Sequence, residues 1–279
     1  MLTVIIVTWN VRELLAACLH SLQADLAEVP ARIVVVDNAS ADGTVAMLRR
    51  DFPAVELIVG ESNAGYAKAN NLALRVHLAD SEYFWLLNPD TVVHRGAVAA
   101  LLAFMRVHPR CGLCGPMLLN ADGSLQHGAF ALPGLVQLLL ETQPLLWRFR
   151  DTWLDGRYPV QRYAEGRPFR VGHPLGAAMF ARAEAVRQVG LLDEAFEMYA
   201  EEVDWAVRMA QAGWECWCVP TARVTHYGGA SSRQANERAE QLKWRSRQRF
   251  YAKHYPPWKR WLAQRLVPPR YRDHAASGV

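Results

Sequence analysis

The chain has 279 residues, of which 51% are hydrophobic and 21% are charged, and its formal net charge is +4. This composition supports a sizeable core and excludes a disordered or collagen-like chain. No apolar run reaches the roughly 18 residues of a membrane-spanning helix, and the first residues indicate a strand rather than a signal peptide. We therefore expect a folded, cytoplasmic protein of one large or two small domains.

The first part of the chain alternates between strands and helices. Short apolar runs are typical of parallel strands buried on both faces, and apolar residues at helical spacing follow these runs. The expected strands are residues 3–7, 32–36, 55–59 and 83–87, and the expected helices are residues 12–22, 67–78 and 97–107, with one more opened by residues 41–44. This alternation predicts an α/β fold with a doubly wound, mostly parallel, Rossmann-like sheet flanked by helices.

The pattern is looser after residue 107. Further strands are expected at residues 112–119 and 215–220, and further helices at residues 183–189 and 203–212. Residues 125–169 are irregular and rich in aromatic residues and proline. Such a segment can be an insertion on the side of the second substrate, a lid, or a surface that binds a partner. Residues 233–279 carry 12 Lys or Arg against 3 Asp or Glu, with a helical pattern from residue 238 onward. Such a basic tail indicates a partner for it.

Four of the five cysteines leave two interpretations open. Cys111 and Cys114 form a C-x-x-C, and Cys216 and Cys218 form a C-x-C, which is enough for a zinc site or a redox pair. The first pair lacks the turn and helix of a redox motif, and the second lies in a strand-like stretch. Because free cysteine is a small hydrophobe that is often buried, we expect core cysteines.

A carboxylate follows the second predicted strand. Asp37 is followed by Asn38 and Ser40, at the end of a parallel strand where ligands bind in open α/β sheets. A carboxylate there can accept the N–H of a uracil or thymine ring, or a ribose hydroxyl. The alternative is that Asp37, Ser40 or Asp42 only caps the next helix.

A glycine turn opens the third predicted helix. Gly65 lies in this turn, and the free N–H groups at a helix N-terminus bind anions. The helix then begins with two adjacent asparagines, Asn70 and Asn71, which are poor helix formers. This favours a functional role over the alternative of exposed polar positions on a capped helix.

Acidic residues form two further candidate sites. Asp90 ends the fourth strand and can bind Mg²⁺ or Mn²⁺ together with substrate phosphates, unless it only forms a turn. Glu201, Glu202 and Asp204 crowd like charges, which suits a general base, although acids also complement the dipole at a helix N-terminus. His226 ends a strand before two glycines, where an imidazole is either a metal ligand or structural.

Taken in order, eight motifs resemble those of the family-2 glycosyltransferases with the glycosyltransferase A-type fold, and in particular their rhamnosyltransferase-like bacterial branch. The resemblance runs from Val4 to about His254. The motifs are Val7-Thr8-Trp9-Asn10, Val36-Asp37-Asn38-Ala39-Ser40, Asn63-Ala64-Gly65-Tyr66 through Asn70-Asn71, Leu87-Asn88-Pro89-Asp90, Gly176-Ala177-Ala178-Met179, Gly190-Leu191-Leu192-Asp193-Glu194, Glu201-Glu202-Val203-Asp204 and His226. Each motif alone is weak, whereas eight in this order and spacing are specific.

This resemblance implies roles for individual residues. Asp90 matches the last acid of a metal-binding D-x-D, reduced here to Asn88-Pro89-Asp90, and His226 matches a diphosphate or metal contact. The family's Glu-Asp base motif is Glu201-Glu202 in this chain, so Glu202 falls on the catalytic position, with Asp204 as the second candidate. The residues implied in binding the nucleotide or donor sugar are Thr8, Trp9, Asn10, Asp37, Asn38, Ser40, Asn63, Gly65, Asn70, Asn71, Asn88 and Gly176.

The resemblance also implies the reaction and the organisation of the chain. The expected reaction is an inverting, metal-dependent transfer of one sugar from a dTDP- or UDP-sugar to a hydroxyl of a glycan or lipid-linked acceptor, in cell-surface polysaccharide synthesis. The sequence lacks the Q-x-x-R-W motif of processive synthases. The expected parts are a catalytic domain (residues 1–232), with a nucleotide-binding half (1–110) and an acceptor half (111–232), and a basic helical extension (233–279).

Other functions remain open. A sugar-1-phosphate nucleotidyltransferase would have a Gly-rich loop after the first strand, which residues 8–12 lack. A non-catalytic nucleotide-sugar binder is favoured by Glu202 and Asn88, which replace the family's acids. Nucleic-acid binding by the tail is not expected. The basic and aromatic residues 238–266 instead suit peripheral association with an anionic membrane at its inner face, or their aromatic side chains pack on the catalytic domain.

Overall fold

The structure is a computed structural model that describes the chain except for residues 28, 150–151, 197, 229–235, 269–270 and 272–279. The elements of the first part are β1 (Leu2–Thr8), α1 (Arg12–Asp25), β2 (Ala31–Asp37), α2 (Thr44–Asp51), β3 (Glu56–Val59), α3 (Tyr66–His77), β4 (Tyr83–Leu87), β5 (Thr91–Val93) and α4 (Ala97–Val107). The middle part contains β6 (Cys111–Leu119), β7 (Leu125–Gln126), β8 (Ala129–Phe130), α5 (Leu135–Thr142), the 3₁₀ helices η1 (Pro144–Phe149) and η2 (Trp153–Asp155), α6 (Val160–Ala164), β9 (Phe169–Val171) and β10 (His173–Pro174). The last part contains β11 (Ala178–Arg182), α7 (Ala183–Val189), α8 (Glu201–Gln211), β12 (Glu215–His226), α9 (Asn236–His254) and α10 (Pro257–Leu266).

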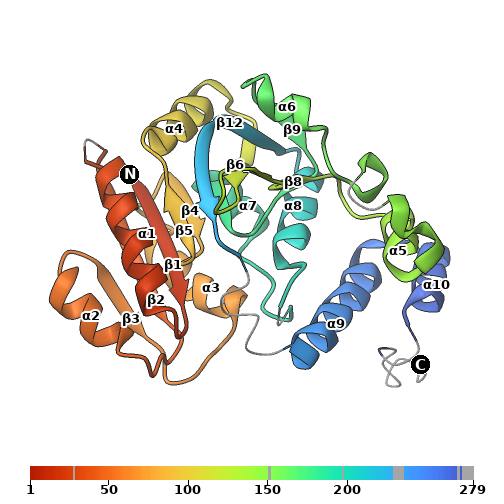
Figure 1. Ribbon diagram of the computed structural model, residues 1–279, viewed down its shortest axis with the longest axis horizontal. Helices are drawn as coiled ribbons and strands as arrows, with labels where there is room; N and C mark the ends of the chain where they lie inside the picture. The colour runs from red at the N-terminus through yellow and green to blue at the C-terminus, as the bar shows by residue number, and fades with distance from the viewer. Residues whose placement is uncertain (28, 150–151, 197, 229–235, 269–270, 272–279) are drawn as a thin grey trace.

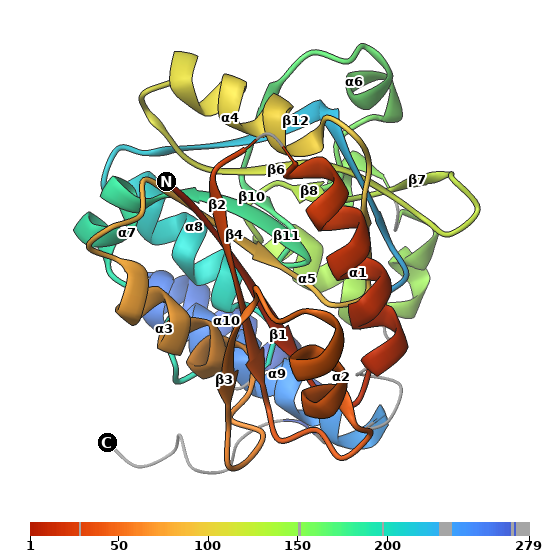
Figure 2. The same cartoon turned by 90° about the vertical axis from the view of Figure 1, so that its left-hand side faces the viewer.

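A mixed, mostly parallel sheet forms the centre of the molecule (Figures 1 and 2). Its strand order is β3-β2-β1-β4-β11-β6-β12-β5, with β7 beside β6 and β9 beside β12. Strand β1 pairs in parallel with β2 and β4, and β6 pairs in parallel with β12, whereas β11 runs antiparallel between β4 and β6. The expected α/β architecture is therefore confirmed.

Four strands of the sheet, β5, β7, β9 and β11, are not predicted by the sequence pattern, and β5 and β11 show why. Strand β5 has only three residues, and it follows the turn after β4 directly. Strand β11 has the sequence Ala-Met-Phe-Ala-Arg and lacks the β-branched side chains on which strand prediction depends. Because both strands run antiparallel to their neighbours, the sheet is mixed rather than wholly parallel.

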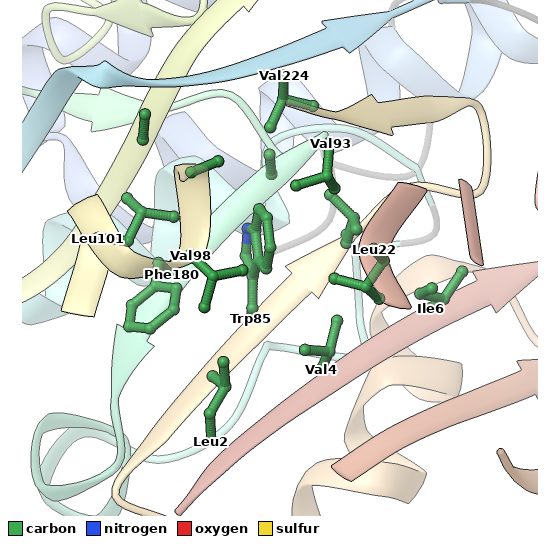
Figure 3. Close-up of a cluster of buried hydrophobic side chains, with 14 of the residues drawn as sticks. Leu2, Val4, Ile6, Leu22, Trp85, Val93, Val98, Leu101, Phe180 and Val224 are labelled. Carbon is green, nitrogen blue, oxygen red and sulfur yellow. The ribbon is translucent and has the colours of Figure 1, made fainter. Parts of the chain in front are cut away.

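Alternate side chains of the central strands belong to two separate cores. On one face, Val4, Ile6 and Trp85 pack in a cluster with apolar side chains of α1, α2 and α4. On the other face, Ile5 and Phe84 pack in a cluster with side chains of α3, α7 and α8. Figure 3 shows the first core, with the Trp85 ring among aliphatic side chains from α1, α4 and β12. Burial on both faces explains the continuous apolar runs in the sequence.

Strand β12 is longer than expected. It continues from Glu215 past Pro220 to His226, with a register shift against β6 between Val219 and Arg223. Proline cannot donate a ladder hydrogen bond, so it is tolerated within a strand where a bulge interrupts the pairing. This continuation matters for function because it carries His226 to the edge strand β5.

The five cysteines are core residues, as expected. All of them are free and buried, and burial raises the pKa of the Cys18 and Cys216 thiols to about 12. A thiol with such a pKa is protonated at neutral pH and is a poor nucleophile. In the described part of the chain, no group of three or more His, Cys, Asp or Glu residues is arranged to hold a metal ion.

The C-terminal helices pack on the middle of the chain, beside α5 (Figure 1). Trp244, Phe250 and Tyr251 of α9 are buried in a cluster that also contains Leu138 and Phe196. The aromatic side chains of α9 therefore pack on the body of the protein, in line with the second of the two interpretations of the tail. None of the described helices is both long and apolar enough to cross a membrane.

Candidate functional site

The loops after β1 and β2 form the first part of the site. The Asn10 N–H donates to Ser40 Oγ (2.9 Å), the Ala41 N–H donates to Asn10 Oδ1 (2.7 Å), and the Ser40 N–H donates to Asp37 Oδ2 (2.9 Å). Asn10 and Ala39 hold φ angles of 52° and 62°, a conformation that side chains disfavour and that concentrates at functional sites. The two loops are thus fixed to each other.

Two buried polar atoms at the ends of these strands have no partner. Thr8 is 1% exposed and Asp37 is 0% exposed, yet Thr8 Oγ1 and Asp37 Oδ1 form no hydrogen bond in the structure. A buried acceptor without a partner costs about 1–3 kcal/mol, and such atoms call for an explanation. A ligand with an N–H or O–H group at this point would satisfy both.

The turn before α3 joins the same region. The Asn38 N–H donates to Thr8 O (2.8 Å), Asn38 Nδ2 lies 3.4 Å from Gly65 O, and Asn63 Oδ1 accepts the Gly65 N–H (3.0 Å). Trp9 beside them is half-buried. The structure therefore brings together the predicted nucleotide residues of all three loops.

Asn70 and Asn71 lie on α3 but are not exposed. Both are 1% exposed; Asn70 Nδ2 donates to Tyr66 O (2.9 Å), and Asn71 exchanges hydrogen bonds with the Leu192 backbone while also donating to Glu194 (2.9 Å). The alternative of exposed polar positions is therefore wrong. Asn71 ties α3 to the segment that precedes α8.

Asp90 and His226 meet although they are far apart in the sequence. His226 Nε2 lies 3.4 Å from Asp90 Oδ1, and the Tyr227 N–H donates to Asp90 O (3.0 Å). Gln126 Nε2 donates to Asn120 Oδ1 (3.0 Å) and to His226 O (3.1 Å), so its Oε1 must face His226 Nδ1, at 2.7 Å. His226 therefore donates from Nδ1.

The hydrogen bond between Gln126 and His226 Nδ1 bears on whether Asp90 and His226 can hold a metal ion. In the neutral ring, a proton on Nδ1 leaves the Nε2 lone pair directed toward the Asp90 carboxylate. Two acceptors that face each other fit a cation between them, and an oxygen and an imidazole nitrogen are donors that Mn²⁺ accepts. Two side chains alone leave most coordination positions to other ligands, such as phosphate oxygens.

The acids of α8 follow an unusual backbone turn. Tyr199 and Ala200 hold φ angles of 63° and 68° in succession, and Glu201 begins the helix. A Cβ atom placed on Gly176 would lie 3.8–3.9 Å from the Glu202 side chain, so Glu202 packs directly against this glycine. The acidic cluster is thus the first turn of α8, rather than a loop before it.

Tyr66 completes this part of the site, and the sequence analysis does not single it out. Its hydroxyl donates to Gly176 O (2.8 Å), on the glycine that Glu202 contacts. Burial raises the pKa of Tyr66 well above its usual range, and the charges of Glu201 and Glu202 add to this shift. Its position directly after Gly65, in the turn that opens the predicted helix, is the sequence feature that could have identified Tyr66 as part of the site.

Glu201 and Glu202 share a desolvated environment. Burial raises the pKa of Glu201 well above its usual range, and the neighbouring Glu202 raises it further; burial also raises the pKa of Glu202. Glu201 is 7% exposed, and its Oε2 has no hydrogen-bond partner. Paired carboxyl groups with raised pKa values are typical of catalytic acids and bases.

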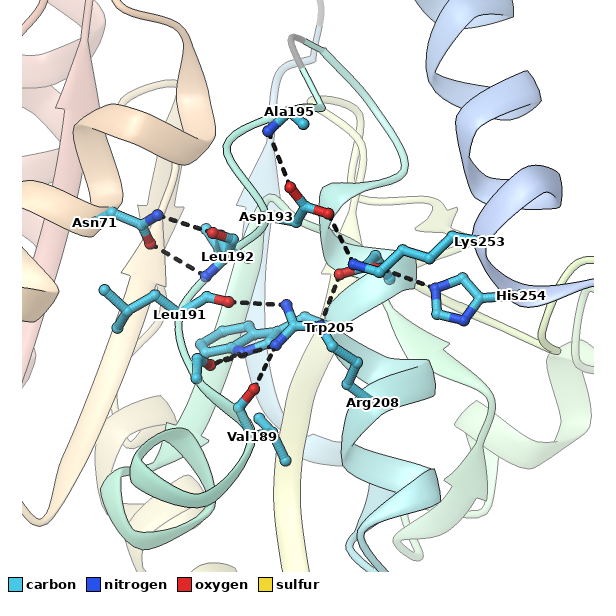
Figure 4. A network of polar contacts seen from close by, with 12 residues as sticks. Asn71, Val189, Leu191, Leu192, Asp193, Ala195, Trp205, Arg208, Lys253 and His254 are labelled. Atoms are coloured by element: carbon cyan, nitrogen blue, oxygen red, sulfur yellow. Dashed lines mark hydrogen bonds and ion pairs between the residues drawn. The ribbon is translucent and has the colours of Figure 1, made fainter. Parts of the chain in front are cut away.

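Asp204 lies in a different environment, among the side chains of Arg208, Lys253 and His254, which are labelled in Figure 4. It is fully buried and accepts hydrogen bonds from Arg208 Nε (2.8 Å), Lys253 Nζ (2.7 Å) and His254 Nε2 (2.7 Å). Although burial acts to raise its pKa, hydrogen bonds from Lys253, His254 and Arg208 lower it overall. The three acids predicted as one cluster therefore divide into a desolvated pair and an ion-paired carboxylate.

Solved structures resemble this chain in fold. A mannosyltransferase from Pyrobaculum calidifontis, in complex with GDP-Man and Mn²⁺, matches with a TM-score of 0.61 and 20% identity, over 92% of this chain and 66% of that one. GalNAc-T7 with UDP, GalNAc and Mn²⁺ matches with a TM-score of 0.58 and 18% identity, over 90% of this chain. This chain spans about half of the GalNAc-T7 chain (50%). The protein thus has the glycosyltransferase A-type fold, as predicted.

Sequence relatives identify the family. The family model of glycosyl transferase family 2 matches residues 3–128. An N-acetylglucosaminyl-diphospho-decaprenol L-rhamnosyltransferase from Mycobacterium tuberculosis is 31% identical over 240 residues, which cover 83% of this chain and 77% of the relative. The chain belongs to glycosyltransferase family 2 and is rhamnosyltransferase-like, which confirms the predicted family.

Proposed function

We propose that the protein transfers one sugar from a dTDP- or UDP-sugar, such as dTDP-rhamnose, to a hydroxyl of a glycan or lipid-linked acceptor, with inversion at the anomeric carbon. The proposal depends chiefly on one observation: the half-buried Glu202 packs against Gly176, which the Tyr66 hydroxyl joins to the turn after β3. A carboxylate with a raised pKa is suited to accept a proton near neutral pH. The name of the mycobacterial relative, an N-acetylglucosaminyl-diphospho-decaprenol L-rhamnosyltransferase, supports a lipid-linked acceptor.

We propose that the loop residues hold the donor nucleotide. Asp37 Oδ1 and Thr8 Oγ1 are buried without partners, so they are placed to bind the N–H of a pyrimidine ring or a ribose hydroxyl. Asn88 donates its N–H to Ala177 O (2.8 Å), which sets it beside Gly176, where the donor sugar would lie. A ligand without an N–H or O–H group at this point would leave these buried oxygens unsatisfied, so the site should bind it more weakly.

Asp90 and His226 are the residues that would hold a divalent cation, Mg²⁺ or Mn²⁺, together with the diphosphate. Such a cation neutralises charge on a leaving diphosphate. The chain's own part of the reaction is then to remove a proton. Glu202 accepts it from the acceptor hydroxyl, whose oxygen attacks the anomeric carbon from the face opposite the leaving group.

We assign the base to Glu202 rather than to Asp204. Hydrogen bonds from Lys253, His254 and Arg208 lower the pKa of Asp204 despite its burial, which makes it a poor proton acceptor. Glu202 has no such partner among the described ion pairs. Burial raises the pKa of both Glu201 and Glu202, and the charge of Glu202 adds to the shift of Glu201, so the pair resists carrying two negative charges.

The test is a panel of dTDP-, UDP- and GDP-sugars, with release of the nucleoside diphosphate as the readout, with Mn²⁺ or Mg²⁺ and with EDTA. We expect turnover with one donor class and its loss in EDTA. Glu202→Gln should reduce turnover by about 10² or more while nucleotide binding persists, and Asp204→Asn should lose less. Full activity of Glu202→Gln beside an inactive Asp204→Asn would contradict the assignment. Binding without turnover for every donor would favour a non-catalytic nucleotide-sugar binder.

We also propose that residues 233–279 act as a basic extension at a membrane. Helix α10 keeps Trp258 (59% exposed), Trp261 (52%) and Leu262 (37%) on its surface, at spacings that place them on one helix face. Lys259 and Arg265 lie over the Trp258 and Trp261 rings. Exposed indole rings beside cations suit the interface of an anionic bilayer, where the acceptor lipid would be found.

A further inference from the structure

The C-terminal helix α9 contacts the helix that carries the proposed base, and we infer that Lys253 and His254 position Glu202. This inference rests on the proposed function, since it takes Glu202 as the base. Neither residue contacts Glu202. Both act through Asp204, two residues further along α8 (Figure 4).

The carboxylate of Asp204 is the point at which the contacts meet. Its Oδ1 lies 2.7 Å from both Lys253 Nζ and His254 Nε2, and its Oδ2 accepts from Arg208 Nε at 2.8 Å. Arg208 also donates to Val189 O (2.8 Å) and to the Leu191 carbonyl. Because Asp204 is fully buried, removing one cationic partner leaves a buried charge under-compensated, which is strongly destabilising locally.

Lys253 makes a second contact that holds the segment before α8. Its Nζ lies 2.7 Å from Asp193 Oδ2, and Asp193 Oδ1 accepts the Ala195 N–H (3.0 Å). The Lys253 ammonium also lies over the Phe196 ring, 5.8 Å from its centre, as does the Arg249 guanidinium at the same distance. One lysine thus joins the start of α8 to the segment that leads into it.

This segment needs to be held because its last two residues are strained. Tyr199 and Ala200 both adopt the left-handed conformation, which costs roughly 1–2 kcal/mol for each residue with a side chain. Such a turn persists only where the surroundings fix it. Asn71 fixes the segment from the α3 side through Leu192, and Lys253 and His254 fix it from the α9 side.

The consequence is local to the base. When the contacts to Asp204 are lost, the turn at residues 199–200 can relax and the first turn of α8 can shift, which moves Glu202 from its place against Gly176. A small misplacement of a catalytic group can cost up to about 100-fold in rate. The loops that would bind the donor nucleotide do not contact α9 in the described contacts, so donor binding should be unaffected.

The experiment compares Lys253→Met and His254→Leu with the wild type, using a soluble acceptor and no vesicles. We expect kcat to fall about tenfold or more, with the KM for the donor sugar changed by less than about twofold. His254→Gln retains an N–H donor at the reach of Nε2 and should restore most of the activity. Arg50→Met is the control, because Arg50 pairs with Asp51 on α2, with an exposed side chain, rather than with Asp204, and it should keep full activity.

Two readouts distinguish a loss of positioning by Lys253 and His254 from misfolding of the variant and from a wrong choice of base. Hydrogen exchange across residues 198–206 should accelerate in Lys253→Met and His254→Leu but not in Arg50→Met. If Lys253→Met or His254→Leu fails to fold by circular dichroism, Lys253→Gln or His254→Ala replaces it in the same comparison, because these variants also remove the contact to Asp204. Wild-type kcat in all Lys253 and His254 variants, with an inactive Glu202→Gln, would overturn the inference alone. A fully active Glu202→Gln would instead overturn the choice of base.

Discussion

Asp37 presents one carboxylate oxygen to its own turn and leaves the other without a partner. Asp37→Ala should therefore weaken binding of UDP or dTDP severalfold or more, because a charge-assisted hydrogen bond contributes about 1.5–3 kcal/mol. Titration calorimetry measures this. The matched control is Asp122→Ala, since Asp122 also accepts a backbone N–H two residues on, from Ser124 (2.9 Å), in a turn outside the site. Equal affinities of Asp37→Ala and the wild type would remove Asp37 from the nucleotide site.

The raised pKa of Glu201 predicts how the stability of the protein depends on pH. Because its pKa is raised above the ordinary value of 4.5 in the folded protein, both states are protonated well below this value, and only the unfolded state ionises readily above it. The wild type therefore loses stability relative to Glu201→Gln as the pH rises through 4.5. Thermal unfolding should give similar Tm values at pH 4 and a higher Tm for Glu201→Gln at pH 7. A lower Tm for the variant at pH 7 would contradict the neutral, unpartnered carboxyl.

Local sequence signals account for part of the geometry of the candidate site. Asp37 and Ser40 are three residues apart, so their turn follows from their own chemistry, and the structure brings them to Asn10 as the parallel pairing of β1 and β2 requires. The contact of Tyr66 with Gly176 spans 110 positions. It depends on β11 lying next to β4, and a strand that the pattern does not reveal cannot place a distant glycine.

At the scale of elements, the turn before α8 is the most constrained. Ala200 caps the helix at φ 68°, where a β-branched side chain is disfavoured and glycine is not. Ala200→Val should destabilise the protein by roughly 1–3 kcal/mol and reduce turnover, whereas Ala200→Gly should remain folded and active. Denaturant unfolding and turnover measure the two effects. Equal stability of the valine and glycine variants would show that the turn is not strained.

Element prediction was accurate where burial alone determines the pattern. Helices α4 and α7 begin and end at the expected residues, 97–107 and 183–189. It was less accurate where tertiary context overrides the local signal. The irregular segment 125–169 contains α5 and α6, and β12 passes through Pro220 because a bulge frees that position from pairing.

At the scale of the whole molecule, charge and exposed aromatic side chains converge on α10. Wild-type protein should sediment with phosphatidylglycerol vesicles at low salt and be released at high salt, since each cation near the surface contributes about 1 kcal/mol. Trp258→Ser with Trp261→Ser should lower the partition coefficient about tenfold, because both indole rings are half-exposed in the free protein. Val107→Ser on α4, which is 71% exposed, is the control. An unchanged partition of the double variant would exclude α10 as the contact.

The pairing of β6 with β12 also has a consequence for how the protein is made. Strand β6 ends at Leu119 and its partner begins at Glu215, so a ribosome needs about 5–20 seconds to supply the intervening stretch of roughly 100 residues. Strand β11 is synthesised earlier and can pair with one edge of β6. The other edge stays unpaired until β12 is made, and during this time it can pair with strands of neighbouring nascent chains. Slower synthesis at low temperature with the same message level should then lower the soluble yield, unless chaperones protect that edge. The order in which β11 and β12 follow β6 therefore makes the pace of translation a factor in how much protein folds correctly.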